Sequence, residues 1–288
     1  MNSLDLKALE IFRTVVIEGG VSKAAVKLNR VQSNISTRIK QLERQLGKKL
    51  FLRQGRGLTL TPDGHLLLSY TERLLQLSME ASEALSEGKP KGIFRIGSME
   101  SAAAVRLPEI LSRYHQLYPE VKIELETDTA GALMKRLLNY DIEIAFVAEP
   151  VSFDAINTQP VFEEKLVLVA PPSFPSLEKT SKISGKTVIA FKTGCAYRRY
   201  LEEWLLESGI VPGGIMAVDS NLTVLACVSA GTGFAVVPQS ILDMVATKGQ
   251  FQIHSLPKKF AQIKTLLAWR TDYQSTKLDA LREILSAS

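Results

Sequence analysis

The chain has 288 residues, of which 45% are hydrophobic and 23% charged, and its formal net charge at pH 7 is +5. These values are typical of a soluble globular protein and leave room for two domains of roughly 150 residues each. No run approaches the roughly 18 consecutive apolar residues of a membrane helix, which excludes that class of protein. Cys195 and Cys227 stand too far apart for a disulfide framework or a zinc motif. Because an acidic residue precedes any apolar run in the N-terminal MNSLDLKALEIF, we expect no signal peptide but a cytoplasmic protein with reduced thiols.

Basic residues are concentrated near the N-terminus. Residues 1–60 contain twelve Lys and Arg against four Asp and Glu, a net charge of +8, whereas the remainder of the chain carries −3. A basic head on a mildly acidic body favours a polyanionic partner for the head. On charge alone, a merely solvated basic face explains the asymmetry equally well.

The first sixty residues show the spacing of a helix-turn-helix followed by a hairpin. Residues 4–18 carry apolar side chains at helical spacing, and the Gly19-Gly20 pair ends that helix. A short second helix carries the Ala24-Ala25 pair, which allows close approach of another helix. A third helix is predicted from about Gln32 to Leu46. Two apolar runs around the Gly-rich basic segment 54–57 then predict a hairpin wing.

The outward face of the third helix is rich in short polar side chains and cations. Such side chains suit base edges and phosphates in a major groove, whereas a purely structural helix more often exposes Glu and Lys. In the wing, arginines would reach a phosphate or the minor groove. The predicted DNA-binding residues are Ser22, Gln32, Ser33, Asn34, Ser36, Thr37, Arg38, Arg53 and Arg56.

A long helix is predicted from residue 61 to about 87, with Thr61 as N-cap and Pro62 at its first position. Its apolar residues alternate three and four apart, as in a coiled-coil seam. Packing against its own domain is the alternative. We favour a two-fold coiled coil, because the other face is polar and a dimer can read a pseudo-palindromic site. The predicted dimerisation residues are Leu67, Tyr70, Leu74, Leu77 and Ala81.

From residue 93 onwards, short β runs alternate with helices, which predicts a mostly parallel α/β sheet. Strands are expected at 93–97, 121–126, 142–147, 166–170, 187–191, 215–218, 234–237 and 265–269. Helices are expected at 102–117, 131–139, 197–208, 222–229 and 276–285.

The head resembles the LysR-type transcriptional regulators, and the total length fits that family. The resemblance is carried by Leu9, Phe12, Ala24-Ala25, Gln32-Ser33-Asn34-Ile35-Ser36, Leu42-Glu43, Leu46-Gly47, Leu50-Phe51-Leu52-Arg53 and Leu60-Thr61-Pro62-Asp63-Gly64. The chain departs from the family pattern at Gly20, Val21 and Val31, where Ser, Phe and Ser are usual.

This resemblance implies a bacterial, ligand-responsive regulator that binds operator DNA as a homodimer or homotetramer, with RNA polymerase as a further partner. It also implies that the C-terminal α/β domain has two lobes, like a periplasmic binding protein. The expected organisation is a winged helix-turn-helix at 1–60, a linker helix and hinge at 61–91, and an effector-binding domain at 92–288. Lobe I would comprise about 92–161 and 267–288, and lobe II about 162–266.

Ligands of such sheets bind at the carboxyl ends of strands, close to helix N-termini. Hydroxyls and backbone N–H groups there suit a carboxylate, whereas Glu100 and Glu149 could hold an ammonium group. An amine or amino-acid-like effector agrees with both the hydroxyl and N–H groups and the two carboxylates, whereas an organic acid agrees only with the hydroxyl and N–H groups. For each of these residues taken singly, the alternative is that it caps a helix or lies in a solvated loop. Segments 97–101 and 195–199 also resemble a branch of putrescine- and amine-utilisation regulators. The predicted effector-binding residues are Ser98, Met99, Glu100, Ser101, Thr129, Ala130, Glu149, Cys195, Tyr197, Arg198 and Asn221.

Two other functions agree less well with the sequence. An enzyme is disfavoured because His65, His115 and His254 accompany no nucleophile motif, and because no P-loop, dinucleotide fingerprint or metal spacing is present. We therefore expect no catalytic residue, metal or cofactor. An architectural DNA binder would not need the large C-terminal body. A thiol sensor at Cys195 is conceivable, because a helix N-terminus lowers a thiol pKa, but without an adjacent cysteine we prefer a small pocket-lining side chain.

Overall fold

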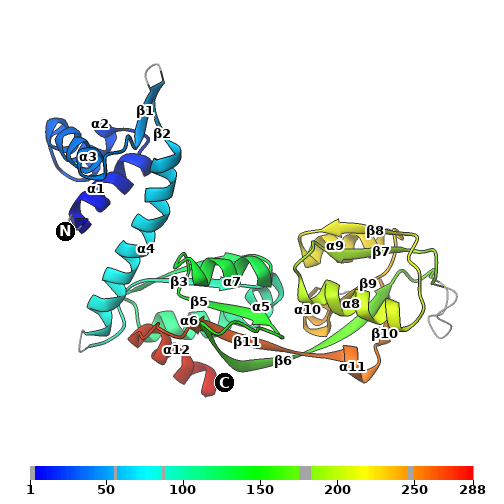
Figure 1. Cartoon of the computed structure of the whole chain (residues 1–288). Helices are drawn as coiled ribbons and strands as arrows, with labels where there is room; N and C mark the ends of the chain where they lie inside the picture. The colour runs from blue at the N-terminus through cyan, green and yellow to red at the C-terminus, as the bar shows by residue number, and fades with distance from the viewer. Residues whose placement is uncertain (1–3, 55–56, 86–87, 175–182, 246–248, 288) are drawn as a thin grey trace. The chain divides into compact units, whose positions relative to one another are not determined.

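The structure is a computed structural model that describes residues 4–54, 57–85, 88–174, 183–245 and 249–287. The chain separates into two compact units, Met1–Glu87 and Gly88–Ser288 (Figure 1). Arg56 lies outside the described residues.

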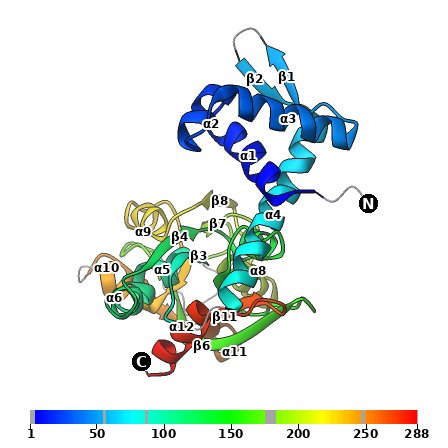
Figure 2. The same cartoon turned by 90° about the vertical axis from the view of Figure 1, so that its left-hand side faces the viewer.

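The first unit contains the predicted helix-turn-helix and wing. In Figure 2 the β-hairpin extends away from the first helices of the chain. The elements are α1 (Leu6–Ile17), α2 (Val21–Lys27), α3 (Gln32–Leu46), β1 (Phe51–Gln54), β2 (Gly57–Leu60) and α4 (Pro62–Ala84). The bounds predicted for the third helix are confirmed by α3, which ends at Gly47 in the left-handed conformation.

The core of this unit forms where the apolar stripes of the helices meet. Leu9 and Phe12 of α1 pack with Ile35 and Leu42 of α3, and Leu50 closes the cluster ahead of β1. All five side chains are buried, and each such burial contributes about 1.5–3 kcal/mol. The core therefore fixes the third helix with its polar face outwards.

The start of α4 is fixed by Thr61, as predicted. The Thr61 hydroxyl accepts a hydrogen bond from the Gly64 N–H (2.9 Å) and donates to the Lys49 carbonyl (2.6 Å). Leu67, predicted to lie in a dimer seam, is instead buried in the core of the first unit. The exposed apolar residues of α4 include Leu66, Tyr70, Leu74, Leu77 and Met79. The seam prediction was thus wrong at Leu67, because this part of α4 packs against its own domain.

The second unit is an α/β structure with a seven-stranded sheet in the order β10-β6-β11-β5-β3-β4, where β9 also pairs with β6, and with a two-stranded β7-β8 sheet. The strands are β3 (Gly92–Ser98), β4 (Val121–Thr127), β5 (Ile144–Ala148), β6 (Ile156–Ala170), β7 (Thr187–Phe191), β8 (Gly214–Val218), β9 (Ala235–Pro238), β10 (Gln252–Ser255) and β11 (Gln262–Arg270). The helices are α5 (Glu100–Val105), α6 (Leu107–Leu117), α7 (Ala130–Leu138), α8 (Ala196–Glu207), α9 (Asn221–Ser229), α10 (Gln239–Val245), α11 (Lys258–Ala261) and α12 (Thr276–Ser286).

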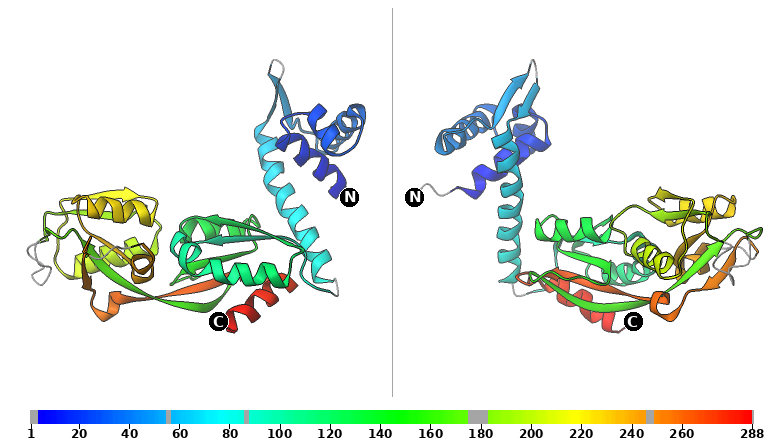
Figure 3. Two further views of the ribbon diagram at one scale, coloured as in Figure 1. Left: turned by 180° about the vertical axis from the view of Figure 1, so that it is seen from behind. Right: turned by 45° about the vertical axis from the view of Figure 1, so that its right-hand side comes forward.

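The sheet is mixed, so the expectation of a mostly parallel sheet was wrong. Parallel pairs join β3 to β4 and to β5, whereas β11 runs antiparallel to both β5 and β6. The cause is the crossing of the chain between two lobes. β6 leaves lobe I and β11 returns to it, so the two strands necessarily run in opposite directions, side by side from one lobe into the other (Figure 3).

The helix expected at 102–117 is divided at Arg106 into α5 and α6. Pro108 lies in the first turn of α6, where its missing N–H costs nothing, but it cannot continue a preceding helix. Because of this break, α5 is a separate short helix, and Glu100 and Ser101 form its start.

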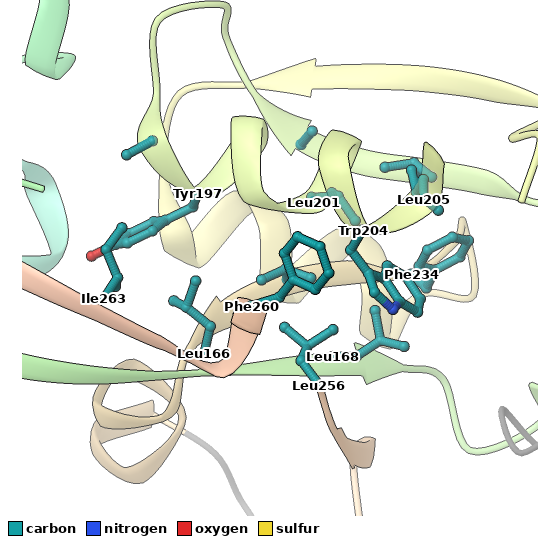
Figure 4. Packing of buried hydrophobic residues seen from close by; sticks show 14 of the residues in the cluster. Leu166, Leu168, Tyr197, Leu201, Trp204, Leu205, Phe234, Leu256, Phe260 and Ile263 are labelled. Carbon is teal, nitrogen blue, oxygen red and sulfur yellow. The ribbon is translucent and has the colours of Figure 1, made fainter. Parts of the chain in front are cut away.

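Each lobe has its own core. In lobe I, Phe94, Phe146 and Leu281 are fully buried between the sheet and its helices. In lobe II, Trp204 of α8 packs with Phe234 and other apolar side chains (Figure 4). Among the described residues, no helix is both long and apolar enough to cross a membrane.

Candidate DNA-binding surface and ligand cavity

The first half of α3 has a polar face that is exposed to solvent. The side chains of Ser33, Asn34 and Arg38 form no hydrogen bond or ion pair within the part of the chain that the structure describes. The exposed residues of this predicted surface are Ser22, Gln32, Ser33, Asn34, Thr37 and Arg38, and Ser36 is half-buried. These donors and acceptors are therefore available for base edges and phosphates.

The wing is the antiparallel pair β1-β2, in which Arg53 stands opposite Leu58. This pairing places the backbone of Arg53 within the hairpin. Arg56 belongs to the tip, outside the described residues, so the structure adds nothing to its predicted role.

The N-termini of α5, α7, α8 and α9 surround one cavity of about 430 Å³, which we call the ligand cavity. Most of the predicted effector residues line it: Met99, Glu100, Ser101, Thr129, Ala130, Cys195, Tyr197 and Asn221. It is also lined by Thr127, Asp128, Phe191, Lys192, Ala196, Asp219 and Ser220. Helix N-termini from both lobes thus converge on one cavity that is partly open to solvent.

Three predicted residues lie elsewhere. Ser98 is fully buried, and its hydroxyl donates to the Met99 carbonyl at 2.9 Å. Arg198 lines a neighbouring cavity of about 470 Å³, which shares Ala130, Cys195 and Ala196 with the ligand cavity. Glu149 lines neither cavity, and its Oε1 accepts the Lys264 N–H at 3.0 Å. The expectation that Glu100 and Glu149 hold an ammonium group together was therefore wrong.

Glu100 connects the two lobes. Its carboxylate accepts hydrogen bonds from Ser220 Oγ (3.0 Å) and from the backbone N and side-chain Nδ2 of Asn221 (both 2.7 Å). Ser220 is the N-cap of α9, but its own side chain makes no capping hydrogen bond. A carboxylate of lobe I thus caps a helix of lobe II, where the helix dipole also favours a negative charge.

A second contact between the lobes joins Ser101 and Tyr197, whose side-chain oxygens lie 2.8 Å apart and are buried. Figure 4 shows the oxygen of Tyr197 on the side of the ring that faces away from Trp204 and Phe234. Burial raises the pKa of Tyr197 well above the usual range for tyrosine, so its hydroxyl stays protonated and neutral.

Cys195 is the N-cap of α8, as its position in the sequence suggested. The backbone N–H groups of Tyr197 and Arg198 favour the thiolate, but burial outweighs them and raises the pKa of the thiol. The helix terminus therefore acts in the expected direction, but desolvation is the larger effect and the net shift of the pKa is upward, which argues against the thiol sensor. The structure places Cys195 in the shared wall of the two cavities, in agreement with a pocket-lining role.

Asp128 and Lys192 also line the ligand cavity but were not among the residues predicted to bind the effector. Each directly follows the end of a strand, β4 and β7 respectively, so the rule that selected Thr129 would also have found them. Among the described residues, no group of His, Cys, Asp and Glu side chains could hold a metal ion.

Known proteins are similar to this chain over nearly its whole length. The model of the bacterial regulatory helix-turn-helix proteins, lysR family, matches residues 6–65, and that of the LysR substrate binding domain matches residues 87–288. The HTH-type transcriptional regulator GltR of Bacillus subtilis is 37% identical over 270 residues, 93% of this chain and 91% of its own. The regulator YofA of Bacillus velezensis is 36% identical over 287 residues, 99% of this chain and 97% of its own.

Solved structures share the fold along nearly the whole chain. Full-length CbnR complexed with its target DNA has a TM-score of 0.71 at 21% identity and covers 99% of both chains. A full-length OxyR variant from Pseudomonas aeruginosa has the same TM-score and identity and covers 98% of this chain and 95% of its own. Full-length BenM is 26% identical with a TM-score of 0.57, covering 99% and 96%.

Proposed function

Since the chain belongs to the LysR family of transcriptional regulators, we propose that it binds an operator as a homo-oligomer through α3 and the wing, under the control of a small polar metabolite in the ligand cavity. Proteins of this family are ligand-responsive DNA-binding regulators and not enzymes. In the proposed division of labour, residues 1–60 bind DNA, 61–91 dimerise and 92–288 bind the ligand.

The observation that carries the DNA-binding part is the exposed polar face of α3. Ser33, Asn34 and Arg38 are exposed on one side of a helix whose other side is buried in the core. Burial of Ile35 and Leu42 leaves this helix no freedom to turn its polar face inwards. Its side chains therefore suit a major groove, in which amide and guanidinium groups distinguish base pairs.

Homo-oligomerisation is supported by the apolar face of α4. Tyr70, Leu74 and Leu77 are exposed, and they are spaced four and three residues apart along the helix. Two copies joined along this face would present two α3 helices to the two halves of a pseudo-palindromic operator. A cytoplasmic location, where operator DNA and RNA polymerase are found, is part of the same proposal.

Ligand control is supported by the position of the ligand cavity between lobes. Glu100 and Ser101 come from lobe I, whereas Tyr197 and Asn221 come from lobe II. A ligand that contacts residues of both lobes binds one arrangement of the lobes better than others, and it therefore shifts the population towards that arrangement.

The test is operator selection from random duplex DNA with the full-length protein, followed by footprinting. We expect one protected sequence for the wild type and no specific footprint for Ser33→Ala/Asn34→Ala/Arg38→Ala. The matched control is Ser112→Ala/Arg113→Ala/Gln116→Ala, which truncates exposed polar residues of α6 and should keep the footprint. A footprint retained by the α3 variant, with an unchanged circular dichroism spectrum, would overturn the assignment of α3 as the recognition helix.

A further inference from the structure

The ligand cavity carries an excess of negative charge. Its lining contains the carboxylates of Glu100, Asp128 and Asp219, against the single ammonium group of Lys192. Lys192 Nζ lies 2.5 Å from Asp219 Oδ2, so these two charges compensate each other. In the part of the chain that the structure describes, Glu100 and Asp128 form no ion pair. Among the described residues, these two carboxylates thus have no cation at ion-pair distance, and the nearby Arg136 interacts with Asp128 only over a longer range.

An independent feature points to a ligand at the same place. Asn221 is only 3% exposed and lines the ligand cavity. Its Nδ2 donates to Glu100 Oε2, which fixes the orientation of the amide, but its Oδ1 receives no hydrogen bond from any described residue. Buried acceptors without a donor are rare in folded proteins. A ligand that brings an N–H group would supply the missing partner.

We propose that the ligand of this cavity carries an aliphatic ammonium group, which donates to the carboxylates of Glu100 and Asp128 and to Asn221 Oδ1. An ammonium group has three N–H donors and no acceptor, and therefore matches the three acceptors that line this cavity. Asp128 can serve in this way because only its Oδ1 is engaged, by the Thr129 N–H at 2.7 Å. This inference rests on the proposed function, since it names the chemical class of the regulator's ligand.

The three acceptors are divided between the two lobes. Glu100 and Asp128 belong to lobe I, and Asn221 begins α9 of lobe II. An ammonium group held by all three therefore adds a link next to the existing hydrogen bonds between Glu100 and Asn221. Ligand binding and the arrangement of the lobes are coupled through this shared contact.

A purely anionic ligand fits the cavity poorly. Its carboxylate would meet the like charges of Glu100 and Asp128, while Lys192 is already paired with Asp219. To reach the N-terminus of α9 it would also have to displace Glu100, whose carboxylate already occupies that position.

The experiment compares three probes with the same four-carbon chain: butylamine, 4-aminobutanoate and butanoate. Binding to the full-length protein is measured by isothermal titration calorimetry. We expect both amines to bind and butanoate to give no heat. Glu100→Gln and Asp128→Asn should each weaken butylamine binding at least about tenfold, the ratio that corresponds to about 1.4 kcal/mol. Glu207→Gln, which removes one negative charge of lobe II outside the cavity, should leave the affinity unchanged.

Asp128→Asn changes an exposed side chain and keeps the inference testable if Glu100→Gln disturbs the fold. Preferential binding of butanoate, absence of binding for both amines at millimolar concentration, or equal affinity of Asp128→Asn and wild type would each overturn the ammonium assignment.

Failure of this inference can be separated from failure of the proposed function by footprinting with each probe. If butanoate alone binds and changes the footprint, ligand-responsive regulation stands and the ammonium assignment falls. If butylamine binds as expected and the footprint does not respond, the ammonium site stands and control of DNA binding through this cavity falls.

Discussion

Lys277 Nζ lies 2.7 Å from Glu143 Oε1, and both side chains are almost fully excluded from solvent, at 2% and 1% exposure. Both side chains form further hydrogen bonds. Glu143 accepts from the Arg95 N–H at 2.7 Å and from the Tyr273 hydroxyl at 3.0 Å, and Lys277 donates to the Ile93 carbonyl at 2.6 Å. The pair thus attaches α12 to β3 and to the segment before β5.

We predict that Lys277→Met destabilises the second unit by about 3–5 kcal/mol, because it leaves a buried carboxylate without its cation. Glu143→Gln in the same chain should recover part of this loss, since it removes the charge and keeps an acceptor. Both tryptophans, Trp204 and Trp269, belong to this unit, so tryptophan fluorescence during urea unfolding reports on it alone. A double variant as unstable as Lys277→Met would contradict this account.

Val31→Ser should stabilise the first unit by about 1 kcal/mol. Val31 is the N-cap of α3 in extended conformation, it is 68% exposed, and its side chain can make no capping hydrogen bond. A serine there would accept from a free N–H of the first turn. Thermal unfolding followed by circular dichroism measures the change. Val31→Ala is the control, and an equal gain from alanine would show that capping is not the cause.

Leu74→Asp and Leu77→Asp should each convert the oligomer to monomers, because both side chains are exposed on the apolar face of α4 and a charge there cannot be buried against a second copy. Size-exclusion chromatography with light scattering measures the molar mass. His65→Asp, an exposed change in the first turn of the same helix, should leave it unaltered. An unchanged mass for both leucine variants would exclude this face as the interface.

Cys195 should react slowly with iodoacetamide in the folded protein. Burial raises the pKa of its thiol, so the reactive thiolate fraction at a given pH is smaller than for a free cysteine, and the rate should still be rising well above pH 8. The rate is measured by mass spectrometry on Cys227→Ser, which leaves a single cysteine, before and after unfolding in urea. Faster alkylation in the folded state would contradict the direction of this pKa shift.

Local features of the fold were predictable and long-range ones were not. The spacing of Ile35, Ile39 and Leu42 together with Gly47 sufficed to delimit α3. The break at Arg106 was missed although Pro108 signals it, because the apolar period continues across the break. The short elements α10 and β10 were also missed, since few residues carry little periodicity. Strand directions depend on where the chain crosses between lobes, which no local pattern records.

In the candidate site too, local features were predictable and long-range contacts were not. The rule that ligands bind at strand ends selected Glu100 and Asn221 separately, because each stands next to a predicted element boundary. Their mutual hydrogen bonds could not be predicted, since 121 positions separate them in the chain. Glu149 satisfies the same rule and yet points to a neighbouring strand, which only the register of β11 against β5 reveals.

The paired strands β6 and β11 form a two-stranded ribbon that belongs to both lobes at once, and its register shifts between Thr265 and Leu266, opposite Phe162 and Pro160. Paired strands twist about each other, and an irregularity in the ladder bends the strand and increases the local twist. Because this ribbon connects the lobes, a ligand that contacts both of them would change the rotation of one lobe relative to the other, and the ribbon would take up that rotation as a small change of twist.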